Sequence, residues 1–351
     1  MKVIVDNKIP YINKAIEKIA DKVIYASGKD FTPELVHDAD ALIIRTRTQC
    51  NKHLLEGSKV RFIATATIGY DHIDTAYCHE AGIEWKNAPG CNAASVAQYI
   101  ESVLLILQKE RNINLRSSTI GIIGVGNVGS KIEMVARKLG MRILKNDLPR
   151  EKKEGKEGFT DLEVIAKECD IITFHTPLHP EGEYKTFHLA NKMFFQSLKR
   201  KPVIINTSRG EVIETQTLLD ALNEEMITEA IIDVWEKEPQ INLELLKKVF
   251  IGTPHIAGYS ADGKANATQM ALEALCAHFN IIPNFKILPP EPDKKIIHTY
   301  NRTEALLQIY NPIRDNNALK KNPELFEQLR GDYPLRREEE AYNIIIESDS
   351  K

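Results

Sequence analysis

The chain has 351 residues, more than one ordinary hydrophobic core supports, so we expect two or three domains. Apolar residues make up 43% and charged residues 27% of the sequence, as in globular proteins. The formal net charge of −3 provides no overall attraction to nucleic acid or to an anionic membrane, so we expect neither as a partner. The composition thus favours a globular protein with a small-molecule function.

The cysteines and the N-terminus indicate the cellular compartment. Five cysteines are scattered along the chain without a Cys-x-x-Cys pair, which favours reduced thiols over a disulfide framework or a metal site. The N-terminus lacks the apolar core of a signal peptide, and the apolar run at 103–107 is too short to span a bilayer. We therefore expect a cytoplasmic protein without a bound metal.

Short apolar runs alternate with helical patterns almost throughout, which predicts parallel sheets covered by helices. In the first block we expect strands at 3–5, 41–46, 61–67 and 83–86, with helices at 10–19 and 72–81. A long apolar helix follows at about 93–109, and a second α/β block begins near residue 119. Its further strands are expected at 171–175, 203–207, 230–234 and 250–252. A helix capped by Thr160 and Glu163 and a long helix at 261–280 complete this pattern, before a proline-rich linker leads into a small C-terminal unit.

The most specific motif is Gly-x-Gly-x-x-Gly, formed by Gly124, Gly126 and Gly129 directly after an apolar strand. The first glycine permits a tight turn, the second lets a pyrophosphate approach the backbone, and the third lets the next helix pack closely. Asp147 follows at the end of the next strand, where a carboxylate binds the ribose hydroxyls and repels a 2′-phosphate. The motif predicts NAD rather than NADP, although Arg150 lies close enough to weaken that preference. The alternative is a glycine-rich turn of another α/β protein.

Two signatures follow later strands, at the sheet edge where open α/β sheets bind ligands. In FHTP, Thr176 can pack against the cofactor, or Pro177 merely ends a strand. In INTSRGEVI, a strand leads into Asn206, Thr207, Ser208 and Arg209. The planar guanidinium of Arg209 fits a carboxylate bidentately, although a surface arginine at a turn is the commoner case.

Two more signatures supply acids and a histidine. Asp233 in DVWEKEP ends a strand; of the two acids that follow, Glu236 and Glu238, one can orient a histidine and the other is expected to be solvated. In GTPHIAGYS, His255 follows a strand and a proline, with Gly258 permitting close approach of the backbone to a ligand. Histidine can accept the hydroxyl proton as a hydride leaves the same carbon, although a structural loop histidine is the alternative. The glycine loop, Arg209, Glu238 and His255 together fit the oxidation of a 2-hydroxy acid.

With GVGNVG, NTSRG, DVWEKEP and PHIAG in place, the sequence resembles the D-2-hydroxyacid dehydrogenase family over about residues 1–283. The resemblance implies two doubly wound parallel-sheet α/β domains, with a Rossmann NAD-binding domain (95–257) inserted in a flavodoxin-like substrate domain (1–94 and 258–283). Stretches such as VDNKIPY and NAPGCNAASVAQY, and the C-terminal extension, narrow the resemblance to a branch acting on a phosphorylated hydroxy acid. In that branch residues 284–351 correspond to a small α+β dimerisation domain, so the resemblance implies a homodimer.

The resemblance also implies roles for individual residues. Arg209 would bind the substrate carboxylate and the oxygen being oxidised, Glu238 would hold His255, and His255 would be the acid/base. The cofactor-binding residues would be Gly124, Gly126, Asn127, Val128, Gly129, Asp147, Thr176, Thr207, Ser208, Asp233 and Gly258. The substrate-binding residues would be Thr46, Thr67, Arg209 and Tyr259.

The substrate phosphate needs cations or amides, and Arg45 and Arg47 flank Thr46 at a strand end, although they can equally be a solvated basic edge. Two other functions remain open. One is a related dehydrogenase acting on 3-phosphoglycerate or an unphosphorylated hydroxy acid. The other is a non-catalytic NAD-sensing protein on the same fold, against which the intact Arg209, Glu238 and His255 argue.

Overall fold

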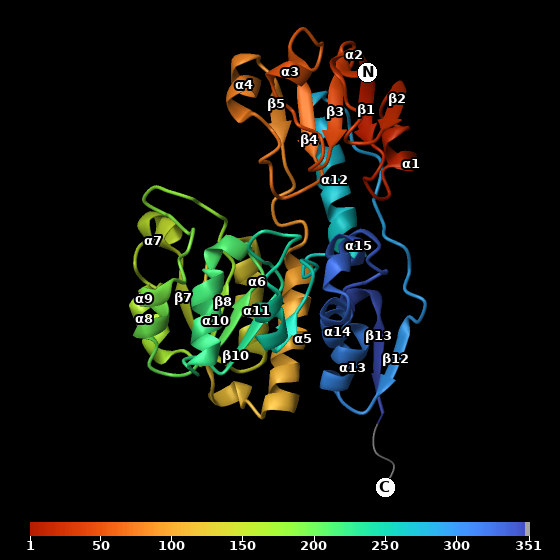
Figure 1. Ribbon diagram of the computed structural model, residues 1–351. Coiled ribbons are helices and arrows are strands. Elements are labelled where there is room, and N and C mark those ends of the chain that lie inside the picture. Colours follow the sequence, from red (N-terminus) through yellow and green to blue (C-terminus); the bar gives the residue numbers. More distant parts are fainter. Residues whose placement is uncertain (348–351) are drawn as a thin grey trace. The chain divides into compact units, whose positions relative to one another are not determined.

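The computed structural model describes residues 1–347, which form two compact units (Figure 1). The first unit consists of residues 1–92 and 260–291, and the second of residues 93–259 together with the chain from residue 292 onward. The sequence of the second unit is therefore inserted into that of the first, and the C-terminal segment belongs to the second unit. The last residues of the expected C-terminal domain, 348–351, lie outside the described part of the chain.

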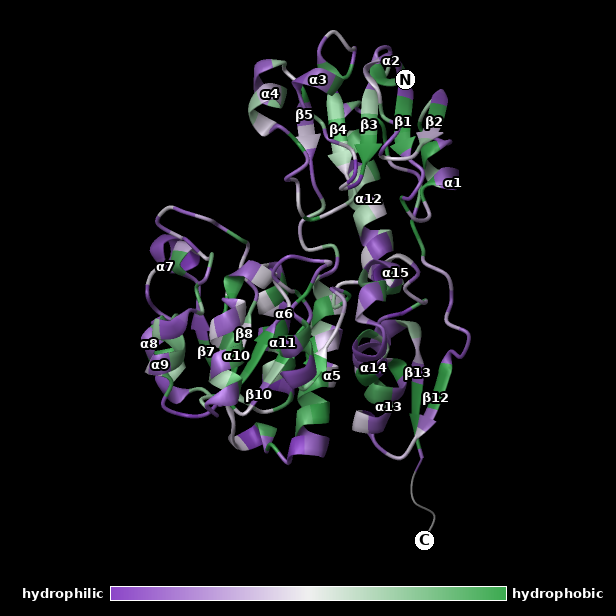
Figure 2. Ribbon diagram, in the orientation of Figure 1, coloured by the Kyte–Doolittle hydropathy of each residue, from purple (hydrophilic) through white to green (hydrophobic). Residues whose placement is uncertain are grey.

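The first unit is built on a five-stranded parallel sheet of order β2-β1-β3-β4-β5, the flavodoxin-type order. Its strands are β1 (Lys2–Asp6), β2 (Lys22–Ala26), β3 (Ala41–Ile44), β4 (Phe62–Thr65) and β5 (Glu84–Lys86). Its helices are α1 (Asn13–Ile16), α2 (Pro33–Val36), α3 (Lys52–Leu55), α4 (Thr75–Glu80) and α12 (Ala261–His278). Val3 and Val5 pack with α1 and α12, whereas Ile4 packs with α2, α3 and α4 on the other face. Because helices cover both faces, β1, β3 and β4 are apolar along their lengths, as Figure 2 shows.

Two expectations for this unit were wrong in detail. The strand β2 was not predicted, although Val23 to Ala26 form a short apolar run; it lies at the sheet edge and its residues are only partly buried or exposed. The helix expected at 10–19 has only the four residues Asn13–Ile16. Tyr11 has a φ of +62°, a left-handed conformation that cannot belong to an α-helix.

The second unit contains a six-stranded parallel sheet of order β11-β10-β9-β8-β6-β7. Its strands are β6 (Thr119–Ile123), β7 (Arg142–Asn146), β8 (Ile171–Phe174), β9 (Val203–Asn206), β10 (Glu229–Ile232) and β11 (Ile251–Gly252). Its helices up to residue 259 are α5 (Ala93–Arg111), α6 (Asn127–Lys138), α7 (Leu148–Glu154), α8 (Leu162–Glu168), α9 (Lys192–Ser197), α10 (Thr215–Asn223) and α11 (Leu243–Lys248). The strand order reverses between β6 and β8, and such a switch point is where doubly wound sheets bind their ligands.

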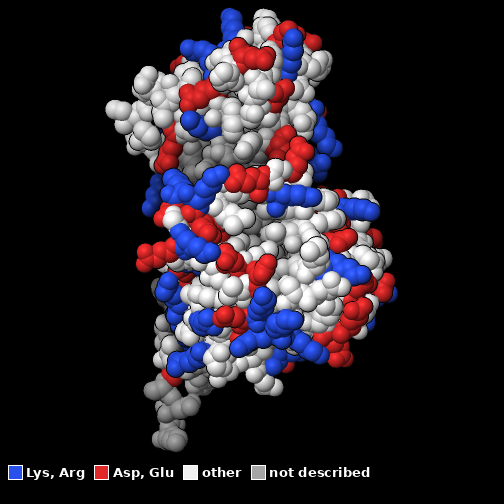
Figure 3. Space-filling model, turned by 90° about the vertical axis from the view of Figure 1, so that its left-hand side faces the viewer, with Lys and Arg blue, Asp and Glu red and all other residues white. Residues whose placement is uncertain are grey.

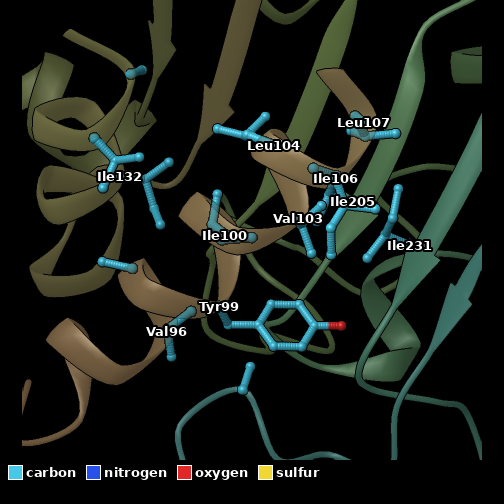
Figure 4. Packing of buried hydrophobic residues seen from close by; sticks show 14 of the residues in the cluster. Val96, Tyr99, Ile100, Val103, Leu104, Ile106, Leu107, Ile132, Ile205 and Ile231 are labelled. Carbon is cyan, nitrogen blue, oxygen red and sulfur yellow. The ribbon is translucent and has the colours of Figure 1, made fainter. Parts of the chain in front are cut away.

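Alternate residues of the central strands face two hydrophobic cores. In β9, Ile205 packs with α5 and α6, whereas Ile204 packs with α8 to α11. The helix α5 is buried along most of its length; Figure 4 shows Tyr99, Val103 and their neighbours against residues of α6, β9 and β10. An apolar helix of this kind is stable only when covered on more than one side, and here the C-terminal segment supplies further cover.

The C-terminal segment packs into the cores of the second unit. It contains β12 (Ile296–Thr299), α13 (Arg302–Ile309), α14 (Ile313–Lys321), α15 (Phe326–Gly331) and β13 (Asn343–Ile346), and β12 pairs with β13 in parallel. Tyr310 is fully buried in the α5 core, while Leu319 and Phe326 are fully buried in the α8–α11 core. The segment is therefore a structural part of the second unit.

The surface carries charges of both signs (Figure 3), and the cysteine thiols lie in the interior. On the face drawn in Figure 3, Lys and Arg are interspersed with Asp and Glu. Cys50, Cys78, Cys91, Cys169 and Cys276 are all buried and none forms a disulfide. Within residues 1–347 no helix is long and apolar enough to cross a membrane.

Candidate active site

The glycine loop between β6 and α6 leaves room for a ligand at one position only. A Cβ on Gly129 would lie 2.0 Å from the carbonyl oxygen of Gly124, so this glycine is needed for the loop to pack on its own helix. Gly124 has a φ of +85°, and a Cβ there would lie 2.7 Å from the carbonyl oxygen of His175. A Cβ on Gly126, by contrast, would meet no protein atom within 4 Å. The missing side chain at Gly126 thus leaves open space that the protein's own packing does not use.

The start of α6 presents backbone donors beside this space. Gly126 is the N-cap residue, and no side chain caps the helix. The first amides, those of Asn127, Val128 and Gly129, therefore have no capping side chain to accept from them, and the positive end of the helix dipole lies there. Such an end binds a phosphate group well.

Asp147 lies beside the loop, at the end of β7. Its Oδ2 accepts a hydrogen bond from the amide of Val125 at 2.8 Å, and its Oδ1 accepts from the amide of Arg150 at 3.1 Å. The guanidinium of Arg150 donates to the carbonyl of Val125 at 2.6 Å and forms a two-point ion pair with Glu154, with both contacts at 2.8 Å. The charge of Arg150 beside the carboxylate of Asp147 is thus partly offset by Glu154.

Next to Asp147 lies a cavity of about 170 Å³ whose lining includes Gly124, Leu148, Pro149, Thr176 and Pro177. The hydroxyl of Thr176 is buried without a hydrogen-bond partner within the described part of the chain. A buried polar atom of this kind is costly unless a ligand or water bonds it. The cavity, the open space at Gly126 and the hydroxyl of Thr176 fit a dinucleotide.

The turn after β9 is shaped by Asn206. Its Oδ1 accepts hydrogen bonds from the amide and the hydroxyl of Ser208, at 3.0 and 2.9 Å, and its Nδ2 donates to the carbonyl of Arg209 at 2.9 Å.

The hydroxyl of Thr207 lies 3.2 Å from Nδ1 of His175. Burial lowers the pKa of His175 to about 3, so its ring is neutral at ordinary pH. His175 was not singled out from the sequence, although it lies within the FHTP signature.

Arg209 is brought close to the loop that follows β10. A Cβ on Gly210 would lie 2.0 Å from the carbonyl carbon of Trp235, so only glycine lets these two backbones pass. Arg209 is partly exposed, and its Nη1 donates to the carbonyl of Ser208 at 2.8 Å. The guanidinium's other donors remain able to meet a carboxylate.

The pair His255 and Glu238 lies at the ends of β11 and β10. Nδ1 of His255 is 2.8 Å from Oε2 of Glu238, and Oε1 of Glu238 accepts from the amide of Trp235 at 2.9 Å. Burial alone would raise the pKa of Glu238, but the hydrogen bond and charge of His255 outweigh it, so the pKa lies below its ordinary value. Glu238 therefore stays ionised and fixes Nδ1 of His255 as a donor, which leaves Nε2 for proton exchange.

The backbone of His255 is held in a strained conformation by Asp233. His255 has a φ of +57°, which is uncommon for a residue with a side chain. Asp233 is buried, and its carboxylate accepts from the hydroxyl of Thr253 and from the amides of Ile256 and Ala257, at 2.6 to 2.9 Å. Burial raises the pKa of Asp233, against the effect of these donors. Asp233 thus organises the loop that carries His255.

The expectation that the second acid of DVWEKEP is solvated was wrong. Oε1 of Glu236 lies 2.8 Å from Nε2 of His188, and Oε2 accepts from the amide of Thr215 at 2.8 Å. Each of the two glutamates therefore has its own histidine. Only tertiary structure could show this, because His188 is 48 residues away in sequence.

Gly258 and Tyr259 follow this loop, and Tyr259 meets a residue that sequence reasoning missed. Nη2 of Arg330, in α15, donates to the hydroxyl of Tyr259 at 3.2 Å, and its Nη1 lies 4.0 Å from Oε2 of Glu238. No motif marks Arg330, so no sequence signal could have found it.

Two expected substrate residues belong to the first unit. Thr46 is exposed in the turn after β3, and Thr67 follows the neighbouring strand β4, so both lie at the same edge of that sheet. The hydroxyl of Thr67 donates to the carbonyl of Gly69 at 2.8 Å and lies 2.7 Å from that of Thr65. Arg45 donates to the carbonyl of Lys8 at 3.1 Å, while Arg47 lies exposed beside Thr46.

Comparisons with known proteins agree with this geometry. Residues 101–257 match the family model of the D-isomer specific 2-hydroxyacid dehydrogenase NAD binding domain. The chain is 69% identical to an erythronate-4-phosphate dehydrogenase of Bacteroides thetaiotaomicron, over 98% of this chain and 99% of that one. It is 39% identical to the enzyme of the same name from Escherichia coli, over 100% of this chain and 95% of that one.

Among solved structures, a cofactor(NAD+)-bound 3-phosphoglycerate dehydrogenase of Entamoeba histolytica superposes with a TM-score of 0.66 at 27% identity. The superposition covers 82% of this chain and 98% of that one. The cofactor is NAD, and the fold is the Rossmann-type architecture of these dehydrogenases.

Proposed function

The chain belongs to the family of the erythronate-4-phosphate dehydrogenases, within the D-isomer specific 2-hydroxyacid dehydrogenases, and from this premise we propose its substrate and mechanism. It is an NAD-dependent dehydrogenase of small hydroxy acids. The proposed reaction is the oxidation of 4-phospho-D-erythronate to (R)-3-hydroxy-2-oxo-4-phosphooxybutanoate. This reaction would serve the biosynthesis of pyridoxal 5′-phosphate.

The observation that carries the catalytic proposal is the 2.8 Å contact between Nδ1 of His255 and Oε2 of Glu238. Bound NAD supplies the acceptor for the hydride that leaves C2 of the substrate. Nε2 of His255 accepts the proton of the C2 hydroxyl, and the carboxylate of Glu238 stabilises the imidazolium that forms. Arg209 binds the substrate carboxylate and polarises the oxygen that becomes the carbonyl.

The cofactor residues have matching proposed roles. The amides at the start of α6, at Asn127, Val128 and Gly129, bind the pyrophosphate, and Asp147 binds the adenosine ribose. Thr176 offers its buried hydroxyl to the cofactor. We assign Asp233, Gly258, Thr207 and Ser208 to the nicotinamide end of the cofactor, and Asp233 also shapes the loop of His255.

For the substrate we propose contacts from Thr46, Thr67, Arg209 and Tyr259. Arg45 and Arg47 are the cations that flank Thr46 in sequence. The alternatives are 3-phosphoglycerate, an unphosphorylated hydroxy acid, and a non-catalytic NAD sensor. Purified protein should reduce NAD when 4-phospho-D-erythronate is the substrate. Its kcat/KM for this substrate should be at least about tenfold above that for 3-phosphoglycerate or D-lactate. Equal or greater activity with either competitor would refute the substrate, and no nicotinamide reduction with any hydroxy acid would favour the sensor.

A homodimer and a cytoplasmic location belong to the same proposal. The sheet β12–β13 of the C-terminal segment exposes Ile296, Ile345 and Ile346 by 51%, 44% and 55%. Three exposed isoleucines on one small sheet favour a protein interface. The free, buried thiols are consistent with a reducing compartment.

A further inference from the structure

The C-terminal segment contributes an arginine that holds the backbone next to His255. Arg336 is buried, with 2% exposure, and its guanidinium donates to the carbonyls of Ile256 and Ala257 at 3.2 and 2.6 Å. It also donates to the carbonyl of Ser95 in α5 at 2.9 Å. The planar fork thus joins the loop that follows His255 to the longest helix of the unit.

Arg336 acts from the opposite side to Asp233. Asp233 accepts from the amides of Ile256 and Ala257, whereas Arg336 donates to the carbonyls of the same two residues. The peptide group between Ile256 and Ala257 therefore has its N–H bonded to Asp233 and its carbonyl bonded to Arg336. A residue with a side chain keeps a φ of +57° only when its surroundings hold the backbone in place. The hydrogen bonds of Asp233 and Arg336 hold the backbone next to His255.

A second arginine of the segment reaches the carboxylate of the catalytic pair. Nη1 of Arg330 lies 4.0 Å from Oε2 of Glu238, the same oxygen that contacts His255. Nη2 donates to the hydroxyl of Tyr259 at 3.2 Å, and the guanidinium lies over the ring of that tyrosine. The side chain of Arg330 is 22% exposed, so water screens its charge only in part.

The charge of Arg330 has a chemical consequence. A permanent cation beside Oε2 lowers the pKa of Glu238, together with the hydrogen bond and charge of His255, and so helps to keep the carboxylate ionised. The acceptor that orients Nδ1 of His255 is thereby maintained. Arg330 and Arg336 both lie beyond residue 257, where the match to the NAD-domain family model ends.

We propose that Arg330 and Arg336 are positioning residues for the dehydrogenase reaction, so that the C-terminal segment completes the catalytic site in addition to any role in association. Arg336 fixes the backbone that carries His255, and Arg330 fixes the carboxylate of Glu238 and the hydroxyl of Tyr259. This inference rests on the catalytic roles proposed above for His255 and Glu238.

The test compares four full-length variants: Arg330→Met, Arg330→Lys, Arg336→Lys and, as the control, Arg302→Met. Arg302 lies in the same segment, at the start of α13, and pairs with Glu339. For each variant we would measure kcat and KM for the hydroxy acid, the Kd for NAD, the thermal midpoint of unfolding, and the pH–rate profile of oxidation. His255→Ala is measured alongside.

We expect Arg330→Met to lower kcat about tenfold or more with the Kd for NAD unchanged. The midpoint of its pH–rate profile on the acid side should move upward, because one of the charges that lower the pKa of Glu238 is gone. Arg330→Lys should retain the charge and hence the midpoint, with a smaller loss of kcat. Arg336→Lys should lower kcat, since one ammonium cannot replace the fork. Arg302→Met should match the parent.

The inference is overturned if Arg330→Met keeps the parental kcat and pH midpoint while His255→Ala is inactive. If Arg336→Lys does not fold, the two Arg330 variants still decide the question. Near-parental turnover of His255→Ala would instead overturn the proposed mechanism itself, so the two failures are distinguishable.

Discussion

Oδ2 of Asp147 accepts a hydrogen bond from the backbone amide of Val125, with 2.8 Å between the two atoms. The bond ties the acid at the end of β7 to the glycine loop after β6. A carboxylate can accept about four hydrogen bonds, and Asp147 accepts two from backbone amides. The remaining two sites can accept from the ribose hydroxyls. The position of this negative charge beside the loop is thus fixed before any cofactor binds.

We predict that Asp147→Ala relaxes the preference for NAD over NADP, because the repulsion of the 2′-phosphate is lost. The ratio of kcat/KM for the two cofactors should fall about tenfold or more. Glu154→Gln is a useful comparison, since it frees Arg150 from its ion pair without touching the carboxylate of Asp147. Wild-type protein that uses NADP as well as NAD would contradict the assignment.

The glycine loop offers a matched pair of substitutions. A Cβ on Gly126 meets nothing within 4 Å, whereas a Cβ on Gly129 would lie 2.0 Å from the carbonyl oxygen of Gly124. Gly126→Ala should therefore keep the parental thermal midpoint and weaken NAD binding. Gly129→Ala should destabilise the cofactor unit by about 2–4 kcal/mol. Calorimetry and NAD titration separate the two effects, and equal NAD affinity for Gly126→Ala and the parent would count against the pyrophosphate site.

His255→Ala should lower turnover by about 10²–10⁴-fold while the Kd for NAD changes little. Glu238→Gln should lose less, because it removes the charge that stabilises the imidazolium but keeps a hydrogen-bond acceptor. The control is His188→Ala, because His188 forms a pair of the same 2.8 Å length with Glu236. A loss in His188→Ala as large as that in His255→Ala would show that the assay reports loop structure rather than proton transfer.

The partly buried His175 predicts a pH-dependent stability. Its pKa is lowered by burial to about 3, so between about pH 6.5 and 3 the unfolded chain binds a proton that the folded chain does not. Its contribution to stability is therefore complete above pH 6.5 and falls as the pH decreases, by about 2 kcal/mol at pH 5. His175→Gln should make the thermal midpoint less dependent on pH between 7 and 5, and His53→Gln, an exposed control, should not. Identical slopes for parent and His175→Gln would refute the prediction.

The proposed homodimer is testable on the exposed sheet β12–β13. Ile345→Glu with Ile346→Glu adds charges to an apolar surface at little cost to the core, since both side chains are about half exposed. Light scattering should then report a monomer where the parent is a dimer. The control is Leu243→Glu, which is 51% exposed in α11. A charged variant that stays dimeric would place the interface elsewhere.

Much of the fold and of the cofactor site could be predicted because the signals are local. The strands β6, β8 and β9 are apolar runs, and the close approach of Gly129 to the carbonyl of Gly124 lies within one short loop. The capping of α8 shows the limit of such signals. Asp161, rather than Thr160, is its N-cap residue, because the amide of Thr160 donates to the carbonyl of Lys145 in β7.

Several features follow from the order of residues alone: the α/β alternation, the glycine loop, the acid at 147 and the chemical types of Arg209, Glu238 and His255. The partners of these residues are set by the packing of the folded chain. Glu236 bonds His188, and Arg336 bonds the carbonyl of Ala257 from 79 positions away. Local hydrogen bonds and apolar periodicity are properties of short segments and can be read from them. A contact between distant segments depends on how the whole chain packs, and a single sequence contains many polar residues that could equally have made it.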